Sequence, residues 1–210
     1  STRTTKNSSQ PPFRNLISVQ SAFPRNGNPF LKAEPDQNQP MPDWKQKKKV
    51  VLGITGGISA YKTPEIVRAL VKAGCDVEVV LTSEGERFVS PMVLSTLAGK
   101  RVWRQADFLS DDTGWRIPHI ALADWADVIL VAPCTAETLS NMARGAGKEL
   151  LCSILLAAGA PVVVFPAMNV NMLNHPATAR NMEILKETGI FIADPETGSL
   201  ACGYEGKGRL

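Results

Sequence analysis

Three short stretches of this sequence contain side chains that could carry out chemistry. His119 follows a proline and enters an expected short helix, and its ordinary pKa of about 6.5 makes it the most plausible general base in the chain. A lone histidine in such a position more often has a structural role. Asn169 and Asn171 lie in segment 166–172, which contains two amides and two thioethers, and Cys202 lies in a glycine-rich C-terminal segment. His119 could therefore act as a general base, and the two amides could line a ligand site.

The segment 166–172 follows the apolar run 161–165, which has the composition of a buried strand. Open α/β folds bind ligands at the carboxyl ends of their parallel strands. Polar groups directly after such a strand therefore indicate a site rather than an ordinary surface. We expect this segment to line the site.

A glycine turn follows the first expected strand, which the apolar run 50–55 indicates. Gly56 and Gly57 come next, Ser59 follows, and apolar residues then recur at helical spacing until Gly74 ends the helix. Strand, glycine turn and helix is an arrangement in which backbone amides can bind a phosphate. The turn matches neither the dinucleotide-binding fingerprint nor a P-loop, so a tight turn without a ligand stays the alternative.

Hydroxyl side chains follow two further expected strands. Thr82 and Ser83 end the strand 76–81, where they could cap a helix that opens over 84–88 or share a phosphate with the glycine turn. Thr135 and Thr138 follow the strong strand signal 127–133 and suit a helix cap and ligand contact alike. The sequence alone leaves these alternatives open.

The order of the elements predicts the fold class. Helices are expected over 91–97, 148–158 and 175–188, a last strand over 190–192, and a variable polar connection over 100–112. Strands that alternate with helices imply right-handed crossovers and a parallel sheet. We therefore expect a single α/β domain, a doubly wound parallel sheet with helices on both faces, flavodoxin-like or Rossmann-like.

Charge and composition divide the 210-residue chain into two parts. Residues 1–49 have a net charge of +6 and the remainder has −3, so the high pI belongs to the polar N-terminal part and does not indicate nucleic-acid binding. We expect a disordered basic tail over 1–48 and the folded domain over 49–210, with a C-terminal glycine-rich segment over about 198–210 that is a flexible lid or a disordered end. An organellar targeting peptide is an alternative for the tail.

The cysteine and hydropathy patterns bound the location. Four cysteines stand far apart with only two histidines in the chain, so neither a disulfide framework nor a metal site is expected. That pattern fits a reducing compartment, and we expect a cytoplasmic protein. No apolar run has the length of about 18 residues that crosses a bilayer, so no membrane partner is expected.

Four segments together resemble the homo-oligomeric flavin-containing cysteine decarboxylases, in particular the phosphopantothenoylcysteine decarboxylases of coenzyme A biosynthesis. They are the glycine turn 56–60, the histidine motif 119–122, the segment 166–172, which is similar to the family's Pro-x-Met-Asn-x-x-Met signature, and the segment 200–209, which resembles the substrate clamp of bacterial members. The resemblance covers residues 49–210. It implies FMN as cofactor, conversion of 4′-phosphopantothenoylcysteine to 4′-phosphopantetheine, and a homotrimer or higher homo-oligomer with FMN near subunit contacts.

The resemblance also implies roles for individual residues. His119 would be the base while the substrate cysteine is oxidised to a thioaldehyde, Asn169 would hold the carboxylate, and Cys202 would protonate the enethiolate left by decarboxylation. The thiocarbonyl accepts the electrons released as carbon dioxide departs. The clamp residues implied to bind substrate are Gly203, Lys207 and Arg209. The residues implied to bind FMN are Gly57, Ser59, Thr82, Ser83, Phe88, Thr135, Ala136, Glu137 and Thr138.

Two departures from the family pattern leave alternatives open. Glu137 stands where the family usually has an asparagine, and a carboxylate cannot donate the hydrogen bonds of an amide. In bifunctional bacterial forms a synthetase domain follows the clamp, whereas this sequence stops at Leu210 and does not say whether the stop is natural.

The alternative functions are a decarboxylase of a peptide's C-terminal cysteine, a flavin prenyltransferase, and a non-catalytic FMN-binding regulatory protein.

Overall fold

Six parallel strands form the central sheet of this protein in a computed structural model that describes residues 48–110, 116–194, 196–199 and 205–210. The sheet order is β3-β2-β1-β4-β5-β6. The bounds are β1 Lys49–Ile54, β2 Asp76–Leu81, β3 Val102–Arg104, β4 Val128–Cys134, β5 Val162–Pro166 and β6 Phe191–Ile192. This is the doubly wound order of a Rossmann-type sheet, and the order reverses between β1 and β4. The expected fold class is confirmed.

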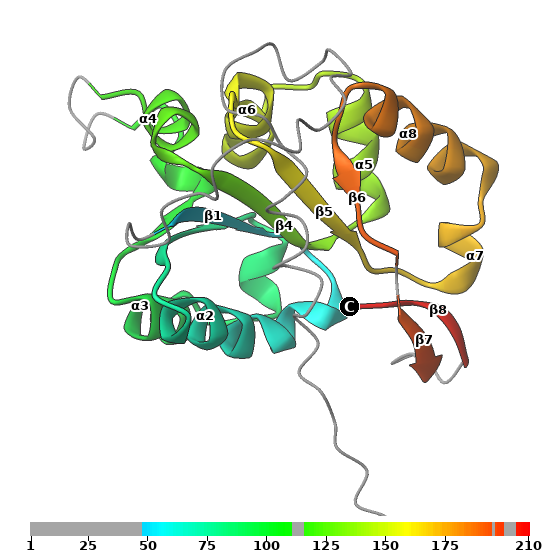
Figure 1. Ribbon diagram of the computed structural model, residues 1–210, viewed down its shortest axis with the longest axis horizontal. Helices are drawn as coiled ribbons and strands as arrows, with labels where there is room; N and C mark the ends of the chain where they lie inside the picture. The colour runs from blue at the N-terminus through cyan, green and yellow to red at the C-terminus, as the bar shows by residue number, and fades with distance from the viewer. Residues whose placement is uncertain (1–47, 111–115, 195, 200–204) are drawn as a thin grey trace, which may run out of the picture. The chain divides into compact units, whose positions relative to one another are not determined.

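Helices cover both faces of the sheet. Figure 1 shows α2 and α3 on one side and α4, α5, α6 and α8 on the other. The helices are α2 Thr63–Lys72, α3 Pro91–Ala98, α4 Pro118–Trp125, α5 Ala136–Ala143, α6 Leu150–Ala157, α7 Val170–Leu173 and α8 Pro176–Glu187. Three 3₁₀ turns, η1 Ile58–Lys62, η2 Gly85–Arg87 and η3 Gln105–Asp107, complete the layers. No helix in the described part of the chain is long and apolar enough to cross a membrane.

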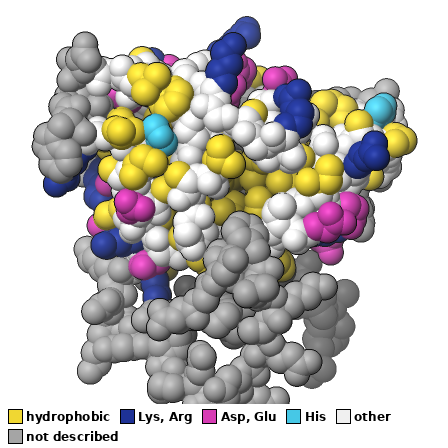
Figure 2. All heavy atoms as spheres, turned by 90° about the horizontal axis from the view of Figure 1, so that it is seen from above, with side chains coloured by type: hydrophobic (Ala, Val, Ile, Leu, Met, Phe, Trp, Pro, Cys, Tyr) yellow, Lys and Arg dark blue, Asp and Glu magenta, His cyan; other side chains and the backbone are white. Residues whose placement is uncertain are grey.

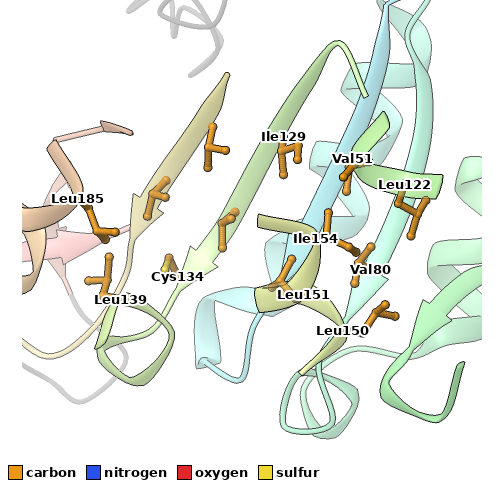
Figure 3. Packing of buried hydrophobic residues seen from close by; sticks show 14 residues of the cluster. Val51, Val80, Leu122, Ile129, Cys134, Leu139, Leu150, Leu151, Ile154 and Leu185 are labelled. Carbon is orange, nitrogen blue, oxygen red and sulfur yellow. The ribbon is translucent and has the colours of Figure 1, made fainter. Parts of the chain in front are cut away.

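The central strands are apolar on both faces because both faces are covered. In β1, only Lys49 is exposed, and Val51 and Leu52 are both fully buried although they point to opposite faces. A cluster of 14 buried residues fills the space between the sheet and the helices α4, α5, α6 and α8, and Figure 3 shows Ile154 from α6 near Val51 and Val80 from the sheet. This core fixes where the strands end.

A glycine lets α6 approach the sheet closely. A Cβ atom built on Gly53 in β1 would lie 2.5 Å from Cδ1 of Leu151. Leu151 is only 1% exposed, so it has little room to move aside. The absence of a side chain at Gly53 therefore sets the distance between α6 and the middle of the sheet.

Most of the expected elements are present, and three differ. The connection expected over 100–112 contains β3 and η3, and the helix expected over 84–88 is only the short η2 turn. The segment after β5 contains a short helix, α7, where only a polar segment following a strand was expected. The strand β3 was missed because its three residues, Val-Trp-Arg, are too few to show a period.

Two expectations concern the ends of the chain. The tail predicted over 1–48 lies outside the described residues except for Lys48. The C-terminal segment contains an antiparallel hairpin of β7 Glu196–Ser199 and β8 Glu205–Arg209, with residues 200–204 outside the described part. All described residues belong to one unit of the chain, Asp43–Leu210.

We predict that Gly53→Ala destabilises the protein by about 1–3 kcal/mol, because the new methyl group overpacks against Leu151. Thermal unfolding of the variant measures the loss. Combining it with Leu151→Val, which removes the clashing volume, should recover part of the loss relative to Leu151→Val alone. Strictly additive effects of the two substitutions would contradict this account.

Candidate functional site

The loops that could bind a ligand meet at one edge of the sheet. Strands β1, β2, β4 and β5 run parallel, so the loops that follow them all leave from the same edge of the sheet, the one formed by the carboxyl ends of its strands. The strand order reverses between β1 and β4, and open α/β sheets bind ligands at such a switch point. The predicted flavin residues and Asn169 all lie in loops or helix starts at this edge.

The loops after β1 and β2 are packed backbone against backbone. A Cβ atom on Gly56 would lie 2.3 Å from the Glu84 Cβ and 3.0 Å from the Glu84 carbonyl carbon. The Thr82 backbone N–H donates to the Ile54 carbonyl at 3.0 Å, and the Thr82 hydroxyl accepts from the Gly85 N–H at 3.1 Å. The Thr82 hydroxyl thus binds the backbone at the start of η2, whose N-cap position is Glu84, while Ser83 beside it is exposed; phosphate contact by these two hydroxyls stays a prediction.

The glycine turn leads into η1 with space beside it. Gly57 precedes η1 without a side-chain cap, and a Cβ atom there would stand 3.8 Å from Thr135 Cγ2 and 4.0 Å from the Ala167 carbonyl. The turn after β1 thus faces the loops after β4 and β5. The first N–H groups of a helical turn have no helical acceptor, and these are the donors that an anion uses.

A buried threonine joins the ends of β1 and β4. The Thr55 hydroxyl donates to the Pro133 carbonyl at 2.8 Å and accepts from the Thr135 N–H at 3.1 Å. Thr55 is only 1% exposed. Sequence reasoning counted this residue as the end of a strand run and missed it, although a hydroxyl directly after a buried strand was the signal available.

Thr135 begins α5 and fixes its first turn. Its hydroxyl accepts from the Thr138 N–H at 3.3 Å and lies 3.1 Å from the Thr138 hydroxyl. Thr135 and Ala136 are partly exposed at this edge and Thr138 is buried, whereas Glu137 is exposed in the first turn. The cap interpretation of Thr135 is therefore confirmed, and ligand contact by this turn stays a prediction.

The segment after β5 presents Asn169 in a fixed orientation. The Asn169 side-chain oxygen accepts from the Asn171 backbone N–H at 2.8 Å and caps α7. Because the oxygen is held in this way, the amide nitrogen turns away from the cap. Met168 packs against the core, whereas Met172 is 49% exposed.

The C-terminal strand β8 lies against this segment. The Met168 N–H donates to the Gly208 carbonyl at 3.1 Å, and the Lys62 ammonium donates to the Leu210 carbonyl. The backbone of residues 208–210 therefore reaches from the loop after β5 to η1 after β1. Lys207 and Arg209 lie in β8, whereas Cys202 and Gly203 lie outside the described residues.

His119 lies apart from these loops in the same chain. It is in the first turn of α4, and its ring packs edge-on against Phe108 with 5.4 Å between ring centres. Figure 1 shows α4 and α7 at opposite ends of the layer. Within the described part of the protein, the buried Nδ1 atom of His119 has no hydrogen-bond partner. A buried polar atom without a partner is rare in folded proteins.

Carboxylates gather near the first turns of α5 and α6. Burial raises the pKa of Glu149, and the negative charges of Glu84 and Glu137 raise it further against the opposing effect of Lys148. No group of three or more His, Cys, Asp or Glu residues that could hold a metal ion occurs among the described residues. The edge is therefore negatively charged around these three glutamates without forming a metal centre.

The described cysteines are not reactive thiols. Burial is the main cause that raises the pKa of Cys152 to about 11, and it raises the pKa of Cys134 still further. Burial also raises the pKa of Cys75. A thiolate is the reactive form of cysteine, so these three thiols stay protonated at neutral pH.

A small cavity of about 270 Å³ lies elsewhere, beside β3 and α4. Glu78, Trp103 and Trp125 contribute to its wall. The Glu78 carboxylate already accepts from the Trp103 indole N–H at 2.8 Å and from the Lys100 ammonium at 2.9 Å. The Glu78 carboxylate at this cavity is therefore already hydrogen-bonded, and the cavity lies apart from the switch point.

The fold and the site together define a doubly wound α/β protein with a ligand-binding edge at its switch point. The family model described as Flavoprotein matches residues 39–210, so the chain belongs to the Flavoprotein family. It is 44% identical over 163 residues to the coenzyme A biosynthesis bifunctional protein CoaBC of Bacillus subtilis, an alignment that covers 78% of this chain. The chain spans about 40% of the length of that relative.

Solved structures show the same similarity. A Cys→Ser mutant of PPC decarboxylase, complexed with pantothenoylaminoethenethiol, is 32% identical with a TM-score of 0.71 and covers 78% of this chain and 91% of its own. The FMN-dependent cysteine decarboxylase SpaF is 27% identical with a TM-score of 0.68 and covers 77% and 89%.

We predict that Glu149→Gln stabilises the protein at pH 8 and loses this advantage as the pH falls. A carboxyl group whose folded pKa is raised above 4.5 destabilises the folded state once it ionises, and this effect vanishes below the unfolded pKa. The melting temperature of the variant should exceed that of the parent at pH 8 and equal it near pH 4. A difference that is the same at both pH values would contradict the assignment.

Proposed function

We propose that this chain catalyses the FMN-dependent decarboxylation of 4′-phosphopantothenoylcysteine to 4′-phosphopantetheine. The observation that carries the proposal is the hydrogen bond from the Met168 N–H to the Gly208 carbonyl, which sets the clamp strand β8 beside Asn169. The matches to coenzyme A biosynthesis proteins and to PPC decarboxylase support the substrate class. Because the chain spans less than half of the bifunctional relative, no second activity is proposed.

The residues at the switch point fit a flavin nucleotide. Backbone N–H groups around Gly57 and Ser59, with Thr82 and Ser83 next to them, would hold the phosphate. The exposed ring of Phe88 and the partly exposed start of α5 at Thr135–Thr138 would contact the ring and the ribityl chain. When bound, FMN would accept hydride from the β-carbon of the substrate cysteine and return it later.

Asn169 would bind the substrate carboxylate. Its side-chain oxygen is engaged in the α7 cap, so the amide N–H₂ is the part that can donate to a carboxylate. Asn171 acquires a role of its own through its backbone, because its N–H holds the Asn169 amide in one orientation. Glu137 is exposed and carries a negative charge, so it would contribute no donor to the flavin.

Cys202 would deliver the proton that completes the product. The three described cysteines have raised pKa values, and Cys134 and Cys152 are buried, which makes them less suited to proton transfer. Gly203, Lys207 and Arg209 belong to the same clamp, and the two cationic side chains would bind the substrate phosphate. A homologous decarboxylase that stops after oxidation has no need of such a proton donor.

His119 would act in a site shared between two copies of the chain. It lies on α4, away from Asn169 on the same chain, and its buried Nδ1 has no described partner. The helices α4 and α6 pack together and expose Ile120 and Leu156 to 41% and 63%. Figure 2 shows hydrophobic side chains on this face. A second copy would cover them, consistent with the proposed homotrimer or higher homo-oligomer in the cytoplasm.

Decarboxylation of a peptide's C-terminal cysteine is the second candidate. The similarity to SpaF favours it, because SpaF is an FMN-dependent cysteine decarboxylase. The clamp next to Asn169 favours the small phosphorylated substrate instead. Turnover of a peptide with a C-terminal cysteine, without turnover of 4′-phosphopantothenoylcysteine, would replace the first proposal with the second.

We predict that Asn169→Asp lowers decarboxylation at least ~100-fold while FMN remains bound. Aspartate keeps the oxygen that caps α7, so the fold is retained, but it loses the amide donors and repels the substrate carboxylate. The matched control is Asn171→Ala, which keeps the backbone donor and should stay within about twofold of the parent. Equal losses in the two variants would mean that only the helix cap matters.

We predict that His119→Asn abolishes turnover with FMN retained, and that co-expression with Asn169→Asp restores activity. In a random mixture of the two chains, roughly a quarter of the shared sites would combine an intact His119 with an intact Asn169. Steady-state turnover of purified mixed oligomers, selected with two affinity tags, measures the recovery. Mixed oligomers without activity would show that both residues serve one site within one chain.

A further inference from the structure

Thr55 is the buried polar residue at the switch point to which neither the family resemblance nor the comparisons give a role. It follows β1, is 1% exposed, and uses its hydroxyl both as donor and as acceptor. One partner lies near the end of β4 and the other directly after it, 78 and 80 residues later in the chain. One side chain therefore fastens together two loops that lie on either side of the expected cofactor.

The Thr55 side chain is needed to join the two loops because the ladder of backbone hydrogen bonds between β1 and β4 stops at this point. The paired register runs from Val50 with Val128 to Gly53 with Val131. Pro133 has no N–H group, so it cannot donate to β1. The Thr55 backbone N–H still reaches the Pro133 carbonyl, at 3.3 Å, and the Thr55 hydroxyl accepts from the N–H of Thr135, the residue that follows β4.

Thr55 influences two further groups, one through its hydroxyl and one through its backbone carbonyl. Thr135 caps α5 by accepting from the Thr138 N–H, so a fixed Thr135 backbone fixes the start of α5. The Thr55 carbonyl accepts from the Gly57 N–H at 2.9 Å, so the same residue fixes the glycine turn. The turn and the start of α5 are the two elements expected to hold the phosphate and the ring of one cofactor.

We infer that Thr55 is a positioning residue that sets the separation between the phosphate-binding turn and the flavin-ring contact at Thr135–Thr138. This inference rests on the proposed function, because it assigns those two elements to one flavin nucleotide. Thr55 makes no contact with the cofactor in this role. It acts through the backbone of Thr135.

The test uses Thr55→Val, which keeps the shape of the side chain and removes both hydroxyl bonds. FMN titrated into the apo-protein, followed by quenching of flavin fluorescence, should give a dissociation constant about tenfold higher than that of the parent. Thr55→Ser keeps both bonds and should restore the affinity to within about twofold. If Thr55→Val does not fold, Thr55→Cys, a weaker donor, takes its place and should weaken FMN binding by a smaller factor.

The matched control is Ser153→Ala. Ser153 in α6 is buried, and its hydroxyl donates to the Gly147 carbonyl at 2.7 Å, but this bond reaches neither the glycine turn nor β4. This variant should lose thermal stability like Thr55→Val while binding FMN as the parent does. Equal loss of FMN affinity in both variants would reduce Thr55 to a general stabilising residue.

Hydrogen exchange supplies a readout that needs no flavin. In the apo-protein, the Thr135 amide should exchange faster in Thr55→Val than in the parent, because it has lost its acceptor. Unchanged Thr135 protection together with unchanged FMN affinity would overturn the inference. A parent protein that binds no FMN at all, with faster Thr135 exchange in the variant, would instead count against the proposed function and leave the fastening in place.

Discussion

The parallel register that brings the ends of β1, β4 and β5 to one edge is the constraint on which the rest of this structure depends. Because β1 and β4 are neighbours at the point where the strand order reverses, the loops that follow them lead to helices on opposite faces of the sheet, and open α/β sheets bind ligands at such a point. Pro133 has no N–H group with which β4 could continue its backbone hydrogen bonds to β1. The Thr55 hydroxyl makes hydrogen bonds to the end of β4 at this place instead. The glycine turn, the start of α5, the Asn169 cap and the strand β8 are all positioned from this edge.

Much of the fold could be predicted from local patterns, because strands buried on both faces are continuous apolar runs and Gly74 marks the end of α2 with a backbone φ of +84°. The strand β3 could not be predicted, since three residues show no periodicity. Its place as an outermost strand of the sheet depends on pairing with β2. The helix α7 was missed for a related reason. A single turn is stabilised by the Asn169 cap rather than by an apolar face, and a cap alone is a weak signal.

The candidate site could likewise be predicted only in part from the sequence. Residue types at strand ends indicated Gly57, Thr82, Thr135 and Asn169, and the structure gathers the loops that contain them at one edge. His119 could not be placed from sequence, because its distance from Asn169 depends on which helices cover which end of the sheet. Its position on α4, at the opposite end of the layer from α7, is the reason we propose a site shared with a second copy of the chain. The hydrogen bond between Met168 and Gly208 joins residues 40 positions apart and likewise has no local signal.

The central claim is that this edge oxidises its substrate, releases carbon dioxide and then returns the electrons to the product. The most direct measurement is the mass of the product formed anaerobically from 4′-phosphopantothenoylcysteine by the purified protein with FMN. The account predicts a product lighter than the substrate by one carbon dioxide, with no other change in composition. A product lighter by one carbon dioxide and two further hydrogens, or an unconsumed substrate in the presence of bound FMN, would contradict it.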